Sequence, residues 1–395
     1  MKKREYLIVN ALIVLGVVFF AGLSFGIFSK LSPKEVLNEQ INQTFTEEES
    51  DSIKELTCSK KDKLSLSSND RHLLALVEYQ DKCNSYVTDS LMFFTDFPYD
   101  NTSAEEKSTT IAKKLTDFST NGIMPMVIVE PYVGDTEMQY KDFINGKYDG
   151  SLERYFSLLK SKGVTDKMMG TWVPFPESNT PNWANKDTEP NDFAIAVNKY
   201  LRVMKKYFPQ AKGSILLSAI TYEPNDLNWE NGDYISLDPY VSNLDRTLIN
   251  SIGIQGFPWV ASASKTHIPS ILRASEFLQP DIAISVAQEL RTRDIWINTG
   301  SFYSKYMNDE EERIFLTLND RKAILDGILE VANYIKSYQL NEYRVKINLF
   351  SEDKSEYAEA TNWSYFQDND SFNLFKEFVS EAEESSIQVS LFDQL

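Results

Sequence analysis

The sequence predicts an α/β protein whose main part is a (β/α)8 barrel, preceded by an N-terminal transmembrane helix and a polar linker. Three observations predict this organisation. Residues 1–28 are largely apolar behind a cationic start, residues 29–70 are polar, and from 71 to 395 short apolar runs alternate with segments of helical period. A chain of 395 residues can hold one large barrel after such a leader.

The amino-terminal segment at 1–28 is predicted to be a membrane anchor or a signal. A helix over the apolar run at 6–28 would span about 34 Å, which is enough for a bilayer core of about 30 Å. The preceding KKRE predicts a single-pass protein of the cell membrane, with its C-terminal domain outside the cytoplasm. Cleavage as a signal peptide, giving a secreted protein, is the alternative, although no A-x-A site is present.

The linker at 29–70 is charged and poor in aromatic residues, so we expect it to lack a packed core. Cys58 lies in this linker, and Cys83 lies early in the barrel domain at 71–395. In an oxidising compartment the two could pair as a disulfide or remain free thiols, and the sequence leaves both possibilities open.

The composition excludes several classes of function. A net charge of −18 argues against nucleic-acid binding, because phosphates would be repelled. With only two histidines and two cysteines, a His-rich or Cys-rich metal site and a Ser-His-Asp hydrolase are not expected. We therefore predict no metal and no cofactor. Abundant carboxylates together with 20 Tyr, 24 Phe and 6 Trp suit carbohydrate chemistry.

Eight strands, mostly followed by helices, are expected in the barrel. Seven are predicted at 72–80, 90–97, 123–132, 167–177, 213–224, 251–260 and 344–350, of which the first could instead be a short helix. The remaining strand lies at 281–289 or at 294–301. We prefer 281–289, because Pro280 should end any preceding helix. A doubly wound open sheet is the runner-up, but the chain lacks the Gly-rich phosphate loop it would call for.

Carboxylates, amides and aromatic residues recur where these strands end, and barrels carry their chemistry at that end. Carboxylates and amides bind sugar hydroxyls, aromatic faces stack on sugar rings, and two carboxylates can cleave a glycosidic bond. The residues predicted to bind substrate are Glu130, Asn179, Trp172, Trp183, Tyr222, Glu223, Trp259 and Asn298.

Several stretches, in order, resemble glycoside hydrolase family 26, the β-mannanase and β-glucanase family of TIM barrels. GIMPMVIVEPY at 122–132 resembles the family's strand that ends in Trp-Glu-Pro, and WVPFPESNTPNW at 172–183 resembles its fourth-strand motif His-Glu-Met-Asn. YEPND at 222–226 and SIGIQGFPW at 251–259 resemble the fifth and sixth strands. The resemblance covers roughly residues 75–365.

The resemblance implies a retaining mechanism with two catalytic carboxylates. It implies that Glu177 is the acid/base and, if the preferred seventh strand is right, that Glu289 is the nucleophile. The other candidate for the seventh strand would put Asn298 in the nucleophile's place. Glu223 and Glu352 are the fallback partners.

These observations together predict an extracytoplasmic glycoside hydrolase of the family 26 type that acts on a β-linked polysaccharide such as mannan or glucan. Its expected partners are a polysaccharide or oligosaccharide and, through the N-terminal helix, the membrane. A catalytically inactive barrel that binds glycan at the cell surface is the alternative.

Overall fold

The barrel is observed in a computed structural model. The residues that the structure describes are 90–120, 122–134, 136–179, 189–219, 237–258, 274–301, 304–306, 313–340, 343–350, 353–354, 361–362, 365 and 369–392. Eight parallel strands pair edge to edge in the spatial order β1-β14-β11-β8-β7-β6-β5-β2 and close on themselves. The predicted (β/α)8 fold is confirmed, and the open doubly wound sheet is excluded.

The eight barrel strands are distributed along the whole described chain. They are β1 (Ser90–Asp96), β2 (Met124–Glu130), β5 (Thr171–Pro174), β6 (Lys212–Ser218), β7 (Ile249–Gln255), β8 (Asp294–Thr299), β11 (Arg344–Phe350) and β14 (Gln388–Phe392). Each is short and rich in apolar residues, as strands buried on both faces are.

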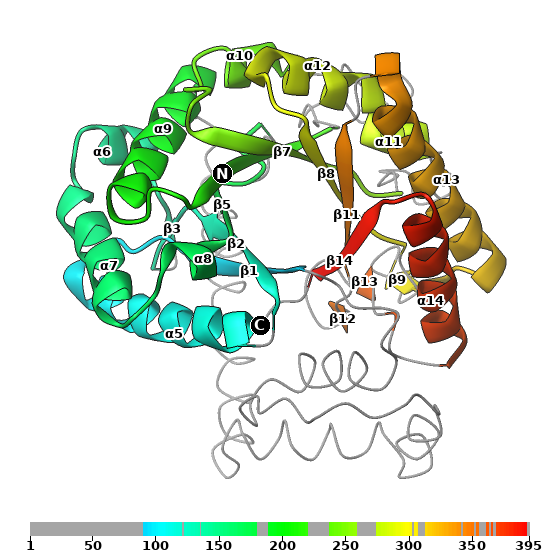
Figure 1. Ribbon diagram of the computed structural model, residues 1–395, viewed down its shortest axis with the longest axis horizontal. Helices are drawn as coiled ribbons and strands as arrows, with labels where there is room; N and C mark the ends of the chain where they lie inside the picture. Colours follow the sequence, from blue (N-terminus) through cyan, green and yellow to red (C-terminus); the bar gives the residue numbers. More distant parts are fainter. Residues whose placement is uncertain are drawn as a thin grey trace, which may run out of the picture. The chain divides into compact units, whose positions relative to one another are not determined.

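Helices surround the strands as an outer ring (Figure 1). They are α5 (Asn101–Thr120), α6 (Tyr140–Ile144), α7 (Asp149–Ser161), α8 (Asp166–Met169), α9 (Pro190–Tyr207), α10 (Asp238–Val241), α11 (Ala274–Leu278), α12 (Pro280–Leu290), α13 (Leu318–Ser337), η2 (Tyr338–Leu340) and α14 (Asn369–Glu384). Their apolar faces pack on the strands, so most of the core lies between the two rings.

The packing of single side chains shows which face of each strand looks outward. Trp172 of β5 packs edge-on against Phe156 of α7, and Phe93 of β1 packs against Phe118 of α5. Strand side chains alternate between faces, so the residues beside Trp172 and Phe93 point into the barrel. Across that interior, the amide of Asn348 on β11 donates to the sulfur of Met126 on β2, at 3.7 Å.

Loops after the strands add small sheets. β3 (Tyr132–Val133) and β4 (Thr136–Glu137) form a hairpin after β2. A four-stranded sheet combines the loop after β8 with the loop after β11. Its strands are β9 (Ser304–Tyr306), β10 (Arg313–Phe315), β12 (Asp353–Lys354) and β13 (Thr361–Asn362). Because they follow the strands, these additions belong to the carboxyl end of the barrel, which we call the mouth.

The preferred seventh strand at 281–289 is wrong. These residues belong to the helix α12, and the competing segment forms the strand β8. Pro280 occupies the first turn of α12, where its missing N–H costs nothing, so it begins a helix instead of a strand. The buried residues Ala283, Ala287 and Leu290 follow a helical period, which the apolar character of the run had hidden.

The sequence also missed the last barrel strand, β14, at the end of the described chain. The strand expected at 72–80 lies outside the described residues, as do the apolar run at 6–28, the linker and both cysteines. Within the described residues, no helix is both long enough and apolar enough to span a bilayer.

Candidate functional site

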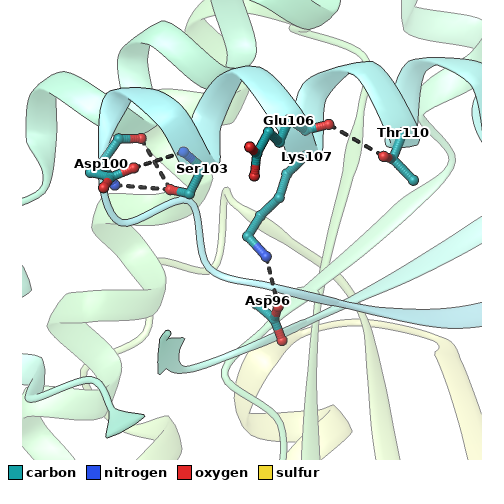
Figure 2. Close-up of polar contacts among 6 residues, drawn as sticks. All are labelled: Asp96, Asp100, Ser103, Glu106, Lys107 and Thr110. Carbon is teal, nitrogen blue, oxygen red and sulfur yellow. Dashed lines mark hydrogen bonds and ion pairs between the residues drawn. The ribbon is translucent and has the colours of Figure 1, made fainter. Parts of the chain in front are cut away.

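Two neighbouring carboxylates end the strands β1 and β2. Asp96 and Glu130 are partners in the register of these strands. Lys107 of α5 forms an ion pair with Asp96, with 2.6 Å between Nζ and Oδ2 (Figure 2). Burial, and then the charges of Glu130, Glu137 and Asp96, raise the pKa of nearby Tyr132. This side of the mouth is therefore electronegative, and predicted site residue Glu130 belongs to it.

A pocket of about 480 Å³ opens beside these carboxylates, between the end of β1 and α5. The register of β14 with β1 ends at Met92, so within the described chain the part of β1 after Met92 lacks a strand neighbour on that side. The lining includes Phe94, Asp96, Lys107, Thr110, Lys114 and Glu130. Asp100 caps the start of α5 by accepting from the Ser103 N–H at 2.7 Å (Figure 2).

The segment after β5, residues 175–179, holds the predicted acid Glu177 in an unusual backbone. Phe175 has a φ of 57° and Glu177 a φ of 55°, both in the left-handed region that non-glycine residues rarely adopt. The Phe175 N–H donates to Val129 of β2, and the Glu177 N–H donates to Leu216 of β6, each at 2.8 Å. Such strain persists only where the surroundings enforce it, and it is typical of functional sites.

Side-chain hydrogen bonds also hold the turn at 175–179 in place. The hydroxyl groups of Tyr140 and Ser178 share a hydrogen bond of 2.6 Å, and Ser178 also donates to the Phe175 carbonyl. Burial raises the pKa of Tyr140 well above its usual range, so its hydroxyl keeps its proton. Asn179 donates to the carbonyl of Ser218 at 2.8 Å and accepts from its N–H at 2.9 Å. Asn179 is thus a clamp between two strand ends, with both amide groups used.

On the other side of the barrel, amides replace carboxylates. Gln255 of β7, Asn298 of β8 and Asn348 of β11 are partners in register, and we call them the amide row. Asn298 donates to the Gln255 side-chain oxygen at 2.5 Å, and the contact of Asn348 with Met126 places the row inside the barrel. All three are buried. The predicted substrate residue Asn298 lies at the centre of the row.

An aromatic pair lies two residues beyond the amide row along the strands. Phe257 follows Gln255, and Phe350 follows Asn348. Their rings make an edge-on contact with centroids 6.0 Å apart, although β8 lies between β7 and β11. Gly300, at the matching position after β8, has no side chain to separate them. Two rings thus lie toward the mouth above the buried amides.

Two predicted site residues lie away from the mouth. Trp172 is fully buried between β5 and α7 and donates through Nε1 to the Met169 carbonyl, so no sugar ring can reach its face. Glu289 lies near the end of α12, with 45 % of its side chain exposed and an ion pair to Arg246. It was expected at a strand end, and we leave it out of the proposed site.

The remaining predicted residues Trp183, Tyr222, Glu223 and Trp259 lie outside the described residues, as does Glu352. The closed barrel does, however, fix which strand precedes each of these carboxylates in the sequence. Glu177 follows the third barrel strand, β5, whereas the fourth and seventh strands are β6 and β11. In the sequence, Glu223 follows β6 and Glu352 follows β11.

Sequence reasoning missed Asn348, Phe257 and Phe350 as site residues. The alternation in RVKINLF offered a signal, because Asn348 and Phe350 share the face that carries Lys346 while Val, Ile and Leu occupy the other. The described residues hold no cluster of three or more His, Cys, Asp or Glu side chains that could bind a metal ion.

The sequence matches no protein-family model and no curated protein. Solved structures with a similar fold include glycoside hydrolases. A family 1 β-glucosidase from Thermotoga maritima bound to isofagomine lactam is 11% identical with a TM-score of 0.44, over 73% of this chain and 82% of that one. A fungal β-1,4-galactanase is 10% identical with a TM-score of 0.44, over 70% of this chain and 82% of that one.

Proposed function

We propose that this chain is an extracytoplasmic glycoside hydrolase that acts on a β-linked polysaccharide such as mannan or glucan, anchored to the membrane by its N-terminal helix. The observation that carries the proposal is the amide row beneath the Phe257–Phe350 pair. Neutral amides that bind hydroxyls, next to aromatic rings that cover an apolar face, are what a sugar ring requires of a binding site.

The strand order supports an assignment of the catalytic carboxylates. In the sheet, β7 and β8 lie between β6 and β11, so the strands that carry Gln255 and Asn298 are flanked by the fourth and seventh strands. Glu223 and Glu352 are the carboxylates that follow those flanking strands in the sequence. We therefore favour them as acid/base and nucleophile. A retaining mechanism needs the two carboxyl groups about 5–5.5 Å apart, and an inverting one about 6.5–9.5 Å.

The motif resemblance supports a competing assignment, with Glu177 as the acid/base. Its strained turn and its anchors to β2 and β6 suit a carboxylate that must be held in one place. Glu130 ends β2, which pairs with β5, and it is then the candidate partner. The two assignments are separable, because they name different residues.

The test is a panel of mannans, glucans and xylans assayed for new reducing ends with the wild type and single Glu→Gln variants. If the favoured assignment is right, Glu223→Gln and Glu352→Gln each lower the rate by more than about a thousandfold, and Glu177→Gln by much less. Glu289→Gln is the matched control, because it changes an exposed carboxylate away from the mouth. A large loss in Glu177→Gln alone would reverse the assignment.

The alternative function is a catalytically inactive barrel that binds glycan. It is favoured by one observation, that Glu289, the expected nucleophile, lies on α12. Wild-type protein that retains glycans in a pull-down but releases no reducing ends from any of them would establish this alternative.

A further inference from the structure

We infer that Asn298 and Asn348 form a buried recognition site for two hydroxyl donors, and that the sugar unit bound there is neutral and not a uronic acid or sulfated sugar. The inference rests on the proposed function for the class of ligand. It goes further by naming the atoms that would recognise the sugar and the charge that the sugar must have.

Each of the two side chains has a buried oxygen without a partner, a property that the described residues show also at the hydroxyls of Tyr155, Tyr200 and Thr299. Asn298 is 3% exposed and Asn348 is 1% exposed. Their amide nitrogens are engaged, Asn298 with Gln255 and Asn348 with the Met126 sulfur, which is a weak acceptor. Within the described residues, Oδ1 of each has no hydrogen-bond donor. Buried acceptors are almost always paired in folded proteins, so a vacant pair calls for an explanation.

In the other buried asparagines of the described chain, both the amide nitrogen and the amide oxygen have a hydrogen-bond partner. Asn179 bonds both backbone groups of Ser218, and Asn198 on α9 bonds the Asn243 carbonyl and the Asp245 N–H. The unpaired amide oxygens are thus confined to Asn298 and Asn348 among these four. Because these two residues are partners in the β8–β11 register, their oxygens start from adjacent positions inside the barrel.

Two adjacent acceptors select the chemistry of the ligand. They require two donors close together, which a sugar supplies through hydroxyl groups on neighbouring carbons. The oxygens of a carboxylate or sulfate only accept hydrogen bonds, so they could not pair with the two asparagine oxygens. Such an anion would also be repelled by Asp96 and Glu130 at the same mouth. The rings of Phe257 and Phe350 lie beyond the amides toward the mouth, where they can cover the apolar face of the sugar.

The decisive variant is Asn348→Leu, which removes the unpaired oxygen at the loss of only one weak contact. Replacing a residue that serves binding should lower the affinity for the ligand, while the free protein stays as stable as wild type or becomes more stable. Asn198→Leu is the matched control, because it changes a buried asparagine whose two partners are backbone groups that would be left unpaired. Asn348→Ala serves as a second variant that adds no bulk.

The experiment measures the Kd of cellobiose, mannobiose and digalacturonic acid by calorimetry, and the Tm of each free protein. We expect wild type to bind at least one neutral disaccharide and not digalacturonic acid. Asn348→Leu and Asn348→Ala should weaken that binding at least tenfold with a Tm within about 2 °C of wild type or above it. Asn198→Leu should lower the Tm and leave the Kd unchanged.

Three results would overturn the inference: no binding of either neutral disaccharide by wild type, an unchanged Kd in both Asn348 variants, or preferential binding of digalacturonic acid. Failure of the proposed hydrolase activity is a separate outcome. A protein that releases no reducing ends but binds a neutral disaccharide through Asn348 would refute the hydrolase and leave this recognition site standing.

Discussion

Replacing Asn179 by alanine should uncouple the strained turn after β5 from the end of β6. The Asn179 side chain is 2% exposed, and it bonds both the carbonyl and the N–H of Ser218, at 2.8 and 2.9 Å. Alanine can make neither bond. The Ser218 backbone groups would then lack these partners, and the turn would lose one of the anchors that hold Phe175 and Glu177 in the left-handed region.

The size of the effect follows from these two bonds. A hydrogen bond of this kind contributes about 0.5–1.5 kcal/mol net, and a buried group left unpaired costs about 1–3 kcal/mol. Ser218 is only half-buried, so water can reach part of the freed backbone, and the lower part of that range applies. We expect Asn179→Ala to lower the free energy of unfolding by about 2–4 kcal/mol.

The assay is urea unfolding followed by fluorescence, with the free energy taken from the midpoint at a constant slope. Asn198→Ala is the matched control, because Asn198 also bonds one backbone carbonyl and one backbone N–H, at 2.9 and 2.8 Å, but on α9. Both variants should lose similar stability, while only Asn179→Ala should also change glycan turnover. A loss below about 1 kcal/mol in Asn179→Ala, or an equal effect of both variants on turnover, would refute this reasoning.

Three further outcomes are expected. Gly253→Ala should destabilise the protein by about 1–3 kcal/mol in a thermal melt, because its new Cβ would lie 2.3 Å from the ring of buried Trp296; an unchanged Tm would contradict the packing. Gly150→Ala in α7 should instead stabilise by up to about 1 kcal/mol, because its Cβ meets nothing within 4 Å; a lower Tm would count against that helix. The Thr247 hydroxyl, followed by other partners, lowers the pKa of Asp245, so its stabilisation is present above the usual pKa of about 4 and disappears as the pH falls through the lowered value. Between pH 2 and 6, the free energy of unfolding should change less with pH in Asp245→Asn than in wild type. An equal pH dependence in the two proteins would exclude this role.

Much of the barrel could be predicted from the sequence because its strands are short apolar runs separated by helical periods. The segment around α12 could not, because an apolar run of that length fits a helix or a strand equally well. Pro280 was then read as a helix breaker, although in the first turn of a helix it is a favourable start. The choice between the two segments was settled by the pairing of β8 with β7 and β11, which is a long-range property.

The candidate site was harder to predict than the fold. Asn298 was named, but its partners Gln255 and Asn348 are 43 and 50 residues away in the sequence and become neighbours only through strand register. The sequence predicts that Trp172 binds substrate, yet its position on the strand turns it toward α7. Residue type alone does not separate side chains that point into the barrel from side chains packed between strand and helix, whereas the parity of each position along its strand does.

The strand count and the amide row lead independently to the same part of the mouth. Because β1 is the first barrel strand, the fourth and seventh strands are β6 and β11, and not the segments at 167–177 and 281–289 that the sequence predicts. The amide row and the aromatic pair were located without reference to that count, from register and ring contacts alone. They occupy β7, β8 and β11, which is the arc that β6 and β11 bound. Under the proposed function, a sugar held by this arc would lie between the strand ends that precede Glu223 and Glu352 in the sequence. A pair built on Glu177 and Glu130 would instead require the sugar to be bound on the carboxylate side, away from the unpaired amide oxygens.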